Sequence, residues 1–139
     1  SLSDGGFATG SMMGSGGFIV MDDSQCVVRH TYTLARFYRH ESCGQCSPCR
    51  EGTGWMEKIL LKLENGQGSM SDIDLLWDIQ RKIEGNTICP LGDAASWPVA
   101  AAIRHFRDEF EWHVTHAAEA QQRNYGLATY ANPIAVPVG

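Results

Sequence analysis

Three cysteines lie close together in the chain, at Cys43, Cys46 and Cys49, with two residues between each neighbouring pair. Glycine, serine and proline surround them, so we expect an exposed loop. Such a loop can turn three thiolates toward one centre. A fourth ligand is needed, and Cys89, which directly precedes Pro90, is the best candidate. A three-cysteine loop with a remote Cys-Pro pair is typical of a 4Fe–4S site.

Other interpretations of these cysteines stay open at this point. A structural zinc ion also binds thiolates, although it more often takes two separated cysteine pairs. Cysteines can also be small buried apolar residues, but the polar loop around this triplet argues against that. A disulfide framework is disfavoured because the chain holds five cysteines, which is an odd number, and shows no secretory signal.

The length and composition limit the class of protein. A chain of 139 residues, 43% of them hydrophobic, can form one globular domain with its own core. The formal net charge of −5 disfavours a nucleic-acid partner. No apolar run approaches the roughly 20 residues of a membrane helix, so direct membrane insertion is not expected. Free thiolates indicate a reducing compartment.

Apolar residues recur at helical spacing in four segments, namely residues 26–41, 54–63, 71–84 and a last segment that begins between 93 and 96 and reaches 114. Ser71 is the predicted start of the third helix. Ser96 is the predicted N-cap of the last one, because Pro98 would then lie in its first turn. We therefore predict a mainly α fold, a small four-helix bundle. Cys26 is predicted to be a packed thiol outside the cluster.

Outside the helices, residues 18–21 read as a short strand after a glycine-rich stretch. From residue 116 onward the helical periodicity is lost, and two prolines predict an extended tail. The predicted organisation is thus a strand-bearing segment over residues 1–25, a helical cluster-binding domain over 26–115 and a C-terminal tail over 116–139.

Three motifs together resemble one known family. They are HESCGQCSPCREG at residues 40–52, ICPLGDAASWP at 88–98 and IRHFR at 103–107. They closely resemble the cluster domain of the NADH-binding flavoprotein subunit of respiratory complex I. The same module occurs in diaphorase subunits of NAD-reducing hydrogenases and in NAD-dependent formate dehydrogenases. The stretch GGFIVMDD at residues 16–23 looks like the last strand of the small β-rich, ubiquitin-like domain that precedes this module.

The resemblance implies a function. The four cysteines would hold one 4Fe–4S cluster, which would take single electrons from reduced FMN and pass them to further iron–sulfur clusters, toward quinone. The FMN and NADH sites belong to an N-terminal part that this chain lacks, so the chain would be the C-terminal piece of an oxidoreductase subunit and no complete enzyme. Partners would be that N-terminal part and iron–sulfur subunits of the peripheral arm. The location would be the bacterial cytoplasm or mitochondrial matrix, at the inner membrane through the complex.

Charged residues near the triplet bear on the cluster's potential. We hypothesise that Arg50, the backbone N–H groups of the loop and the start of the following helix stabilise the reduced cluster and raise its potential. Glu51 can offset the charge of Arg50. His40 and His105 are interpreted as surface or interface residues in preference to hydrogen-bond donors to the cluster ligands or proton carriers. The spacing of the five histidines does not predict a separate metal site.

Overall fold

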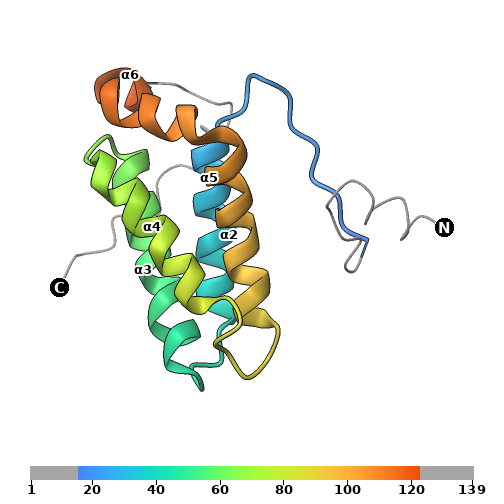
Figure 1. Cartoon of the computed structure of the whole chain (residues 1–139). Helices are drawn as coiled ribbons and strands as arrows, with labels where there is room; N and C mark the ends of the chain where they lie inside the picture. The colour runs from blue at the N-terminus through green and yellow to red at the C-terminus, as the bar shows by residue number, and fades with distance from the viewer. Residues whose placement is uncertain (1–15, 123–139) are drawn as a thin grey trace.

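The computed structural model describes residues 16–122. These are helical apart from the segment 16–26 and the loops that connect the helices. Within these residues five helices follow one another: α2 at Val27–Glu41, α3 at Ser47–Glu64, α4 at Met70–Ile83, α5 at Leu91–Thr115 and α6 at Ala117–Gln122. Figure 1 shows α2 to α5 running roughly side by side, with α6 lying across one end. The predicted four-helix bundle is therefore confirmed.

The first helix, α2, agrees with the predicted segment 26–41. Cys26 is its N-cap, and the Cys26 thiol accepts a hydrogen bond from the backbone N–H of Arg29 at 3.4 Å. Val28, Tyr32 and Ala35 lie on the buried face, at the helical spacing that an amphipathic helix requires. The helix ends at Glu41, just before the cysteine loop.

The second helix, α3, begins at Ser47, well before the predicted start at residue 54. Pro48 lies in its first turn, where a missing N–H costs nothing because that donor has no partner within the helix. Of the predicted apolar stripe, Met56, Leu60 and Leu63 are fully buried and Ile59 is partly buried. Consequently the cysteine motif is half loop and half helix.

The third helix, α4, begins at Met70 rather than at the predicted Ser71. Ser69 is its N-cap and forms a capping box with Asp72: the Asp72 carboxylate accepts the Ser69 N–H at 2.7 Å. Lys62 on α3 also donates to Asp72, at 2.8 Å. Burial raises the pKa of Asp72, but these hydrogen bonds outweigh burial and leave that pKa below its ordinary value.

The fourth helix, α5, begins at Leu91, so the predicted cap at Ser96 was wrong. Ser96 is fully buried inside the helix, where its hydroxyl donates to the Asp93 carbonyl at 2.9 Å. Pro98 is an interior residue of α5. The helix is interrupted at Phe106, whose φ of −135° and ψ of 33° are not helical. After this interruption α5 bends across the end of the bundle (Figure 1).

The segments at the two ends of the described chain also differ from prediction. Residues 18–21 form no strand, and Phe18, Ile19 and Val20 are 82%, 69% and 93% exposed. A strand needs a neighbouring strand to satisfy its backbone, and the described residues offer none. Helix α6 falls within the predicted tail, whose residues 123–139 lie outside the described part of the chain.

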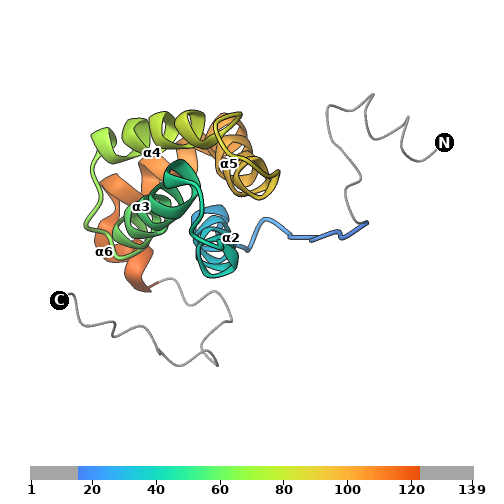
Figure 2. The ribbon, with the colours of Figure 1, turned by 90° about the horizontal axis from the view of Figure 1, so that it is seen from below.

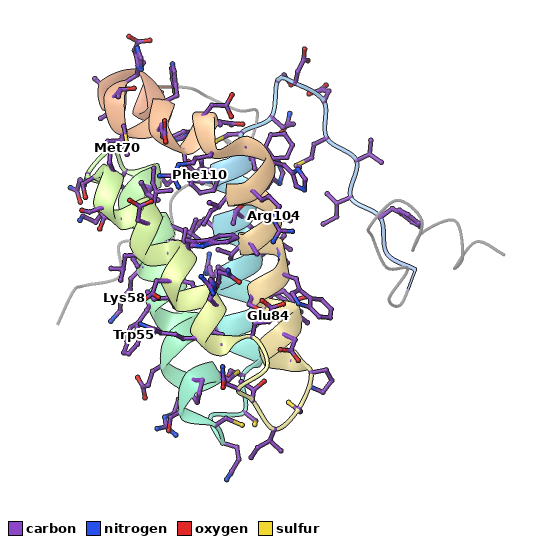
Figure 3. The ribbon with its side chains drawn as sticks, in the orientation of Figure 1. Trp55, Lys58, Met70, Glu84, Arg104 and Phe110 are labelled. Atoms are coloured by element: carbon purple, nitrogen blue, oxygen red, sulfur yellow. The ribbon has the colours of Figure 1, made fainter. Side chains whose placement is uncertain are left out.

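The bundle core lies between all four long helices. Viewed along the bundle, α3 packs between α2 and α4, and α5 closes the ring against α4 and α2 (Figure 2). Leu60, Ile73 and Phe110 are each fully buried in this core. Burying a side chain of this size stabilises the folded chain by roughly 1.5–3 kcal/mol. Trp55 and Lys58 point outward from α3, while Phe110 lies at the α6 end (Figure 3).

Candidate metal centre

The cysteine triplet lies at the end of the bundle where α2 turns into α3. Residues 42–46 make this turn, with Gly44 in the left-handed region at a φ of +78°, which glycine adopts without steric cost. Cys46 is the N-cap of α3 and Cys49 lies in its first turn. The turn and the helix start therefore hold two of the three thiols on a rigid element.

The predicted fourth ligand is brought to this end by the loop between α4 and α5. The backbone N–H of Ile88 donates to the Cys46 sulfur at 3.4 Å, across 42 positions of sequence. The Thr87 hydroxyl donates to the Cys89 carbonyl at 3.0 Å. The structure thus places Cys89 in the loop that lies against the triplet.

Packing fixes the position of this second loop. Asp93, in the first turn of α5, accepts the Gly85 N–H at 2.7 Å. Gly92 sits directly against Thr87, since a Cβ on Gly92 would lie 2.4 Å from the threonine hydroxyl oxygen. Only glycine allows that approach. The loop is therefore held at both of its ends and in its middle.

The four cysteines differ in their exposure. Cys49 is 6% exposed, Cys46 is half-buried, and Cys43 and Cys89 are exposed. None of the four forms a disulfide. One thiol is therefore buried in the bundle and two lie at its surface. A group bound by these thiols would lie close to a partner that binds this end of the bundle.

Two helix N-termini meet at this end. Helix α3 begins directly after Cys46 and α5 begins two residues after Cys89. The first N–H groups of a helix lack partners within it, and the helix dipole places partial positive charge there. The sequence predicted one such helix start, and the early start of α5 adds the second. Both favour an anionic group bound by the cysteines.

Hydroxyl groups support the buried thiol. The Ser42 hydroxyl lies 3.2 Å from the Cys49 sulfur. The Thr53 hydroxyl, which is fully buried, donates to the Cys49 carbonyl at 2.8 Å. Sequence reasoning did not single out these two residues, although a serine and a threonine flank the motif. Hydrogen bonds to thiolate sulfur are one of the means by which proteins set a cluster's potential.

Arg50 connects the two halves of the motif. Its guanidinium donates to the Gly44 carbonyl at 2.9 Å, to the Ser47 hydroxyl at 3.4 Å and to the Glu51 carboxylate at 2.8 Å. The ion pair with Glu51 agrees with the expected offset of charge. The contact with the Gly44 carbonyl was not expected, and it gives Arg50 a role in closing the cysteine loop.

The other predicted candidates lie apart from this centre. His40 is 86% exposed in its side chain and pairs with the neighbouring Glu41. His105 is exposed on α5. Cys26 is buried, as predicted, and its thiol lies 3.1 Å from His113 Nε2, not in the cysteine loop.

Four cysteines are a donor set that fits an iron–sulfur cube. Within residues 16–122, the group of metal-binding side chains whose ligand atoms gather within 4.8 Å is Cys26, Glu109 and His113, and not the loop cysteines. A single zinc ion needs such close ligands, because its bonds are about 2.0–2.3 Å long. A cube presents a different iron to each of four thiolates.

Comparison with known proteins agrees with this chemistry. The family described as the NADH-ubiquinone oxidoreductase-F iron–sulfur binding region matches residues 29–113. The NADH-quinone oxidoreductase F subunit of Rickettsia typhi is 49% identical over 119 residues, or 86% of this chain and 26% of that protein. Its counterpart in Rickettsia bellii is 53% identical over 104 residues, or 75% of this chain and 25% of that protein. The chain thus spans about a quarter of these relatives.

Solved structures of an NAD⁺-reducing [NiFe]-hydrogenase contain a similar fold. The air-oxidised form aligns with a TM-score of 0.65 and 34% identity, over 68% of this chain and 17% of the hydrogenase chain. The family match covers more than half of the chain, and this family takes a 4Fe–4S cluster. The chain therefore belongs to the family of NADH-ubiquinone oxidoreductase-F iron–sulfur binding regions.

Proposed function

We propose that this chain is the one-electron relay domain of an NADH-oxidising flavoprotein subunit, with Cys43, Cys46, Cys49 and Cys89 as its cluster ligands. The observation that carries this proposal is the hydrogen bond from the Ile88 N–H to the Cys46 sulfur, which joins the remote Cys-Pro loop to the triplet. A 4Fe–4S cluster bound there supplies a carrier of single electrons.

The residues around the thiols prepare the site for that task. The N-termini of α3 and α5 and the Ser42 hydroxyl all favour negative charge at the thiolates. The buried Cys49 anchors the site to the bundle. Cys43 and Cys89 are exposed, so a neighbouring redox group can approach the site from their side. A rigid, partly exposed site of this kind supports electron exchange without a conformational change.

The activity of the whole subunit lies beyond this chain. We propose that FMN and NADH bind to the remaining three quarters of a protein like its relatives, and that the reduced flavin is the electron donor. The acceptors would be iron–sulfur subunits of a peripheral arm on the cytoplasmic or matrix side of the inner membrane. None of the helices in residues 16–122 combines the length and apolar character needed to cross a bilayer.

The same module could instead serve a soluble NAD-reducing hydrogenase. The fold similarity to the hydrogenase structure supports that alternative. The identity is 34% to the hydrogenase and 49% to the oxidoreductase of Rickettsia typhi. This difference supports our proposal of a complex I type of enzyme in preference to a hydrogenase.

The proposal is tested by producing the chain anaerobically and measuring iron, sulfide and the EPR spectrum after dithionite reduction. We expect about four irons and four sulfides per chain and a reduced-cluster signal. Cys89→Ala should abolish that signal, because it removes the fourth thiolate. Cys26→Ala is the matched control and should keep the signal. Zinc at the four cysteines without sulfide would contradict the proposal and leave a structural module.

A further inference from the structure

A second group of metal-binding side chains lies at the opposite end of the bundle. Cys26 is the N-cap of α2, and Glu109 and His113 lie on α5, beyond its interruption at Phe106. One ligand atom from each of the three side chains can be chosen so that all lie within 4.8 Å of one another. Helix α2 is 15 residues long, so roughly 22 Å separates this group from the cysteine loop.

The geometry of this group fits a zinc ion. The Cys26 sulfur lies 3.1 Å from His113 Nε2. Tetrahedral bonds of about 2.3 Å to sulfur and about 2.05 Å to nitrogen would separate these atoms by about 3.5 Å. Glu109 and His113 are four residues apart on one helix, which places both side chains on the same face. Small side-chain movements therefore suffice to seat an ion between them.

The surroundings also favour a cation that binds thiolate and imidazole. Cys26 and His113 are 1% and 0% exposed, whereas Glu109 is only partly buried. Cys26 supplies a sulfur ligand and His113 an imidazole nitrogen, from two different helices. Zinc accepts thiolate, imidazole and carboxylate together, whereas magnesium and calcium prefer oxygen ligands alone.

The negative charges of Glu109 and Glu64 also favour a bound cation. Glu109 already accepts the Val27 N–H at 2.9 Å through one oxygen, which leaves its other oxygen for a metal. Its negative charge acts on the buried Glu64: burial is the main cause of the raised pKa of Glu64, and Glu109 adds to it. Arg29 pairs with Glu64 at 3.1 Å. Arg29 thus balances the negative charge of Glu64, and a divalent cation bound by Glu109 would balance the negative charge of Glu109.

We propose that Cys26, Glu109 and His113 bind one Zn²⁺ ion, with a water molecule as the fourth ligand. Binding would release the Cys26 thiol proton to solvent and would involve no change of oxidation state. The ion would fasten the start of α2 to the far half of α5. Cys26 is then a metal ligand as well as a packed residue, at a site independent of the proposed cluster.

The first test measures zinc, iron and sulfide on the anaerobically prepared chain after dialysis against a weak chelator. We expect about one zinc per chain beside the full iron content. Cys26→Ala and His113→Gln should lose the zinc and keep the iron, and the control His105→Gln should keep both. A wild-type chain that binds no zinc when supplied with it would overturn this site, whatever the iron content shows about the cluster.

A second measurement identifies the ligands without a variant. Zinc X-ray absorption of the wild-type chain should show one sulfur at about 2.3 Å and three nitrogen or oxygen ligands at about 2.0–2.2 Å. A shell of four sulfurs would assign the zinc to the loop cysteines and overturn the proposal. Removing the zinc with a stronger chelator should also lower the Tm of the wild-type chain and leave that of Cys26→Ala unchanged.

Discussion

At the scale of single residues, charge and hydrogen bonding near the cysteines matter most. Arg50 and Glu51 are neighbours in sequence, pair at 2.8 Å and are both about half exposed. They carry opposite charges at similar positions beside the loop. Arg50 has an additional task, because it donates to the Gly44 carbonyl that turns the loop.

The potential of the cluster should respond to these two residues in opposite directions. Arg50→Gln removes a cation and should lower the midpoint potential, since the reduced cluster carries one more negative charge. Glu51→Gln removes an anion and should raise it. Each shift should be on the order of tens of millivolts, because about 1 kcal/mol between exposed charges corresponds to roughly 40 mV for one electron. An EPR redox titration measures both, and shifts of the same sign would contradict the charge argument.

At the scale of the elements, the start of α3 depends on close packing against α4. Gly52 is buried in α3, and a Cβ there would lie 2.6 Å from the Ile83 side chain. A Cβ on Gly54, two residues later, would lie 3.6 Å from Arg39 Nε, which is an ordinary contact distance. Both glycines are helical, so conformational freedom does not distinguish them, and only the space around each one does.

These two glycines make a matched pair for alanine substitution. Gly52→Ala should destabilise the chain by about 1–3 kcal/mol, because the added methyl overpacks the contact between α3 and α4. Gly54→Ala should stabilise it by up to about 1 kcal/mol, since alanine is the better helix former. Anaerobic denaturant unfolding gives both values. A Gly52→Ala chain as stable as Gly54→Ala would show that Ile83 can move aside.

At the scale of the whole molecule, the stability of the bundle should depend on pH through a buried carboxyl. Glu64, near the end of α3, connects to α2 through Arg29. Burial raises the pKa of Glu64 above its ordinary 4.5, Glu109 raises it further, and Arg29 opposes both. The folded chain therefore holds this proton more tightly than the unfolded chain does.

The sign of the effect follows from that difference. The stabilisation from Glu64 is complete below its unfolded pKa of 4.5 and is lost as pH rises through the higher folded pKa. Glu64→Gln cannot titrate, so its free energy of unfolding relative to the wild type should increase between pH 5 and 8. The exposed control Glu119→Gln should show a flat difference. Denaturant unfolding across this pH range tests it, and a difference that decreases would refute the assignment.

Much of the fold and of the site could be predicted from local patterns. Helical spacing of apolar residues predicted four helices and their bundle. The spacing of Cys43, Cys46 and Cys49 and the remote Cys89 predicts a donor set, because ligand type and local spacing are properties of the covalent chain. That donor set stays a prediction. The ends of the helices were predicted less well, since Ser47 and Leu91 begin helices whose first turns are held by packing and by contacts to other loops.

Contacts between distant residues were decided only by the tertiary structure. The sequence by itself determined which side chains can bind metal, but not that Ile88 reaches Cys46 or that Cys26 meets His113, 87 positions away. It also predicted a strand at residues 18–21, where the structure has none. The physical reason is common to all three: a contact or a strand pairing forms only where packing brings a partner to it, and no local pattern contains the partner's position.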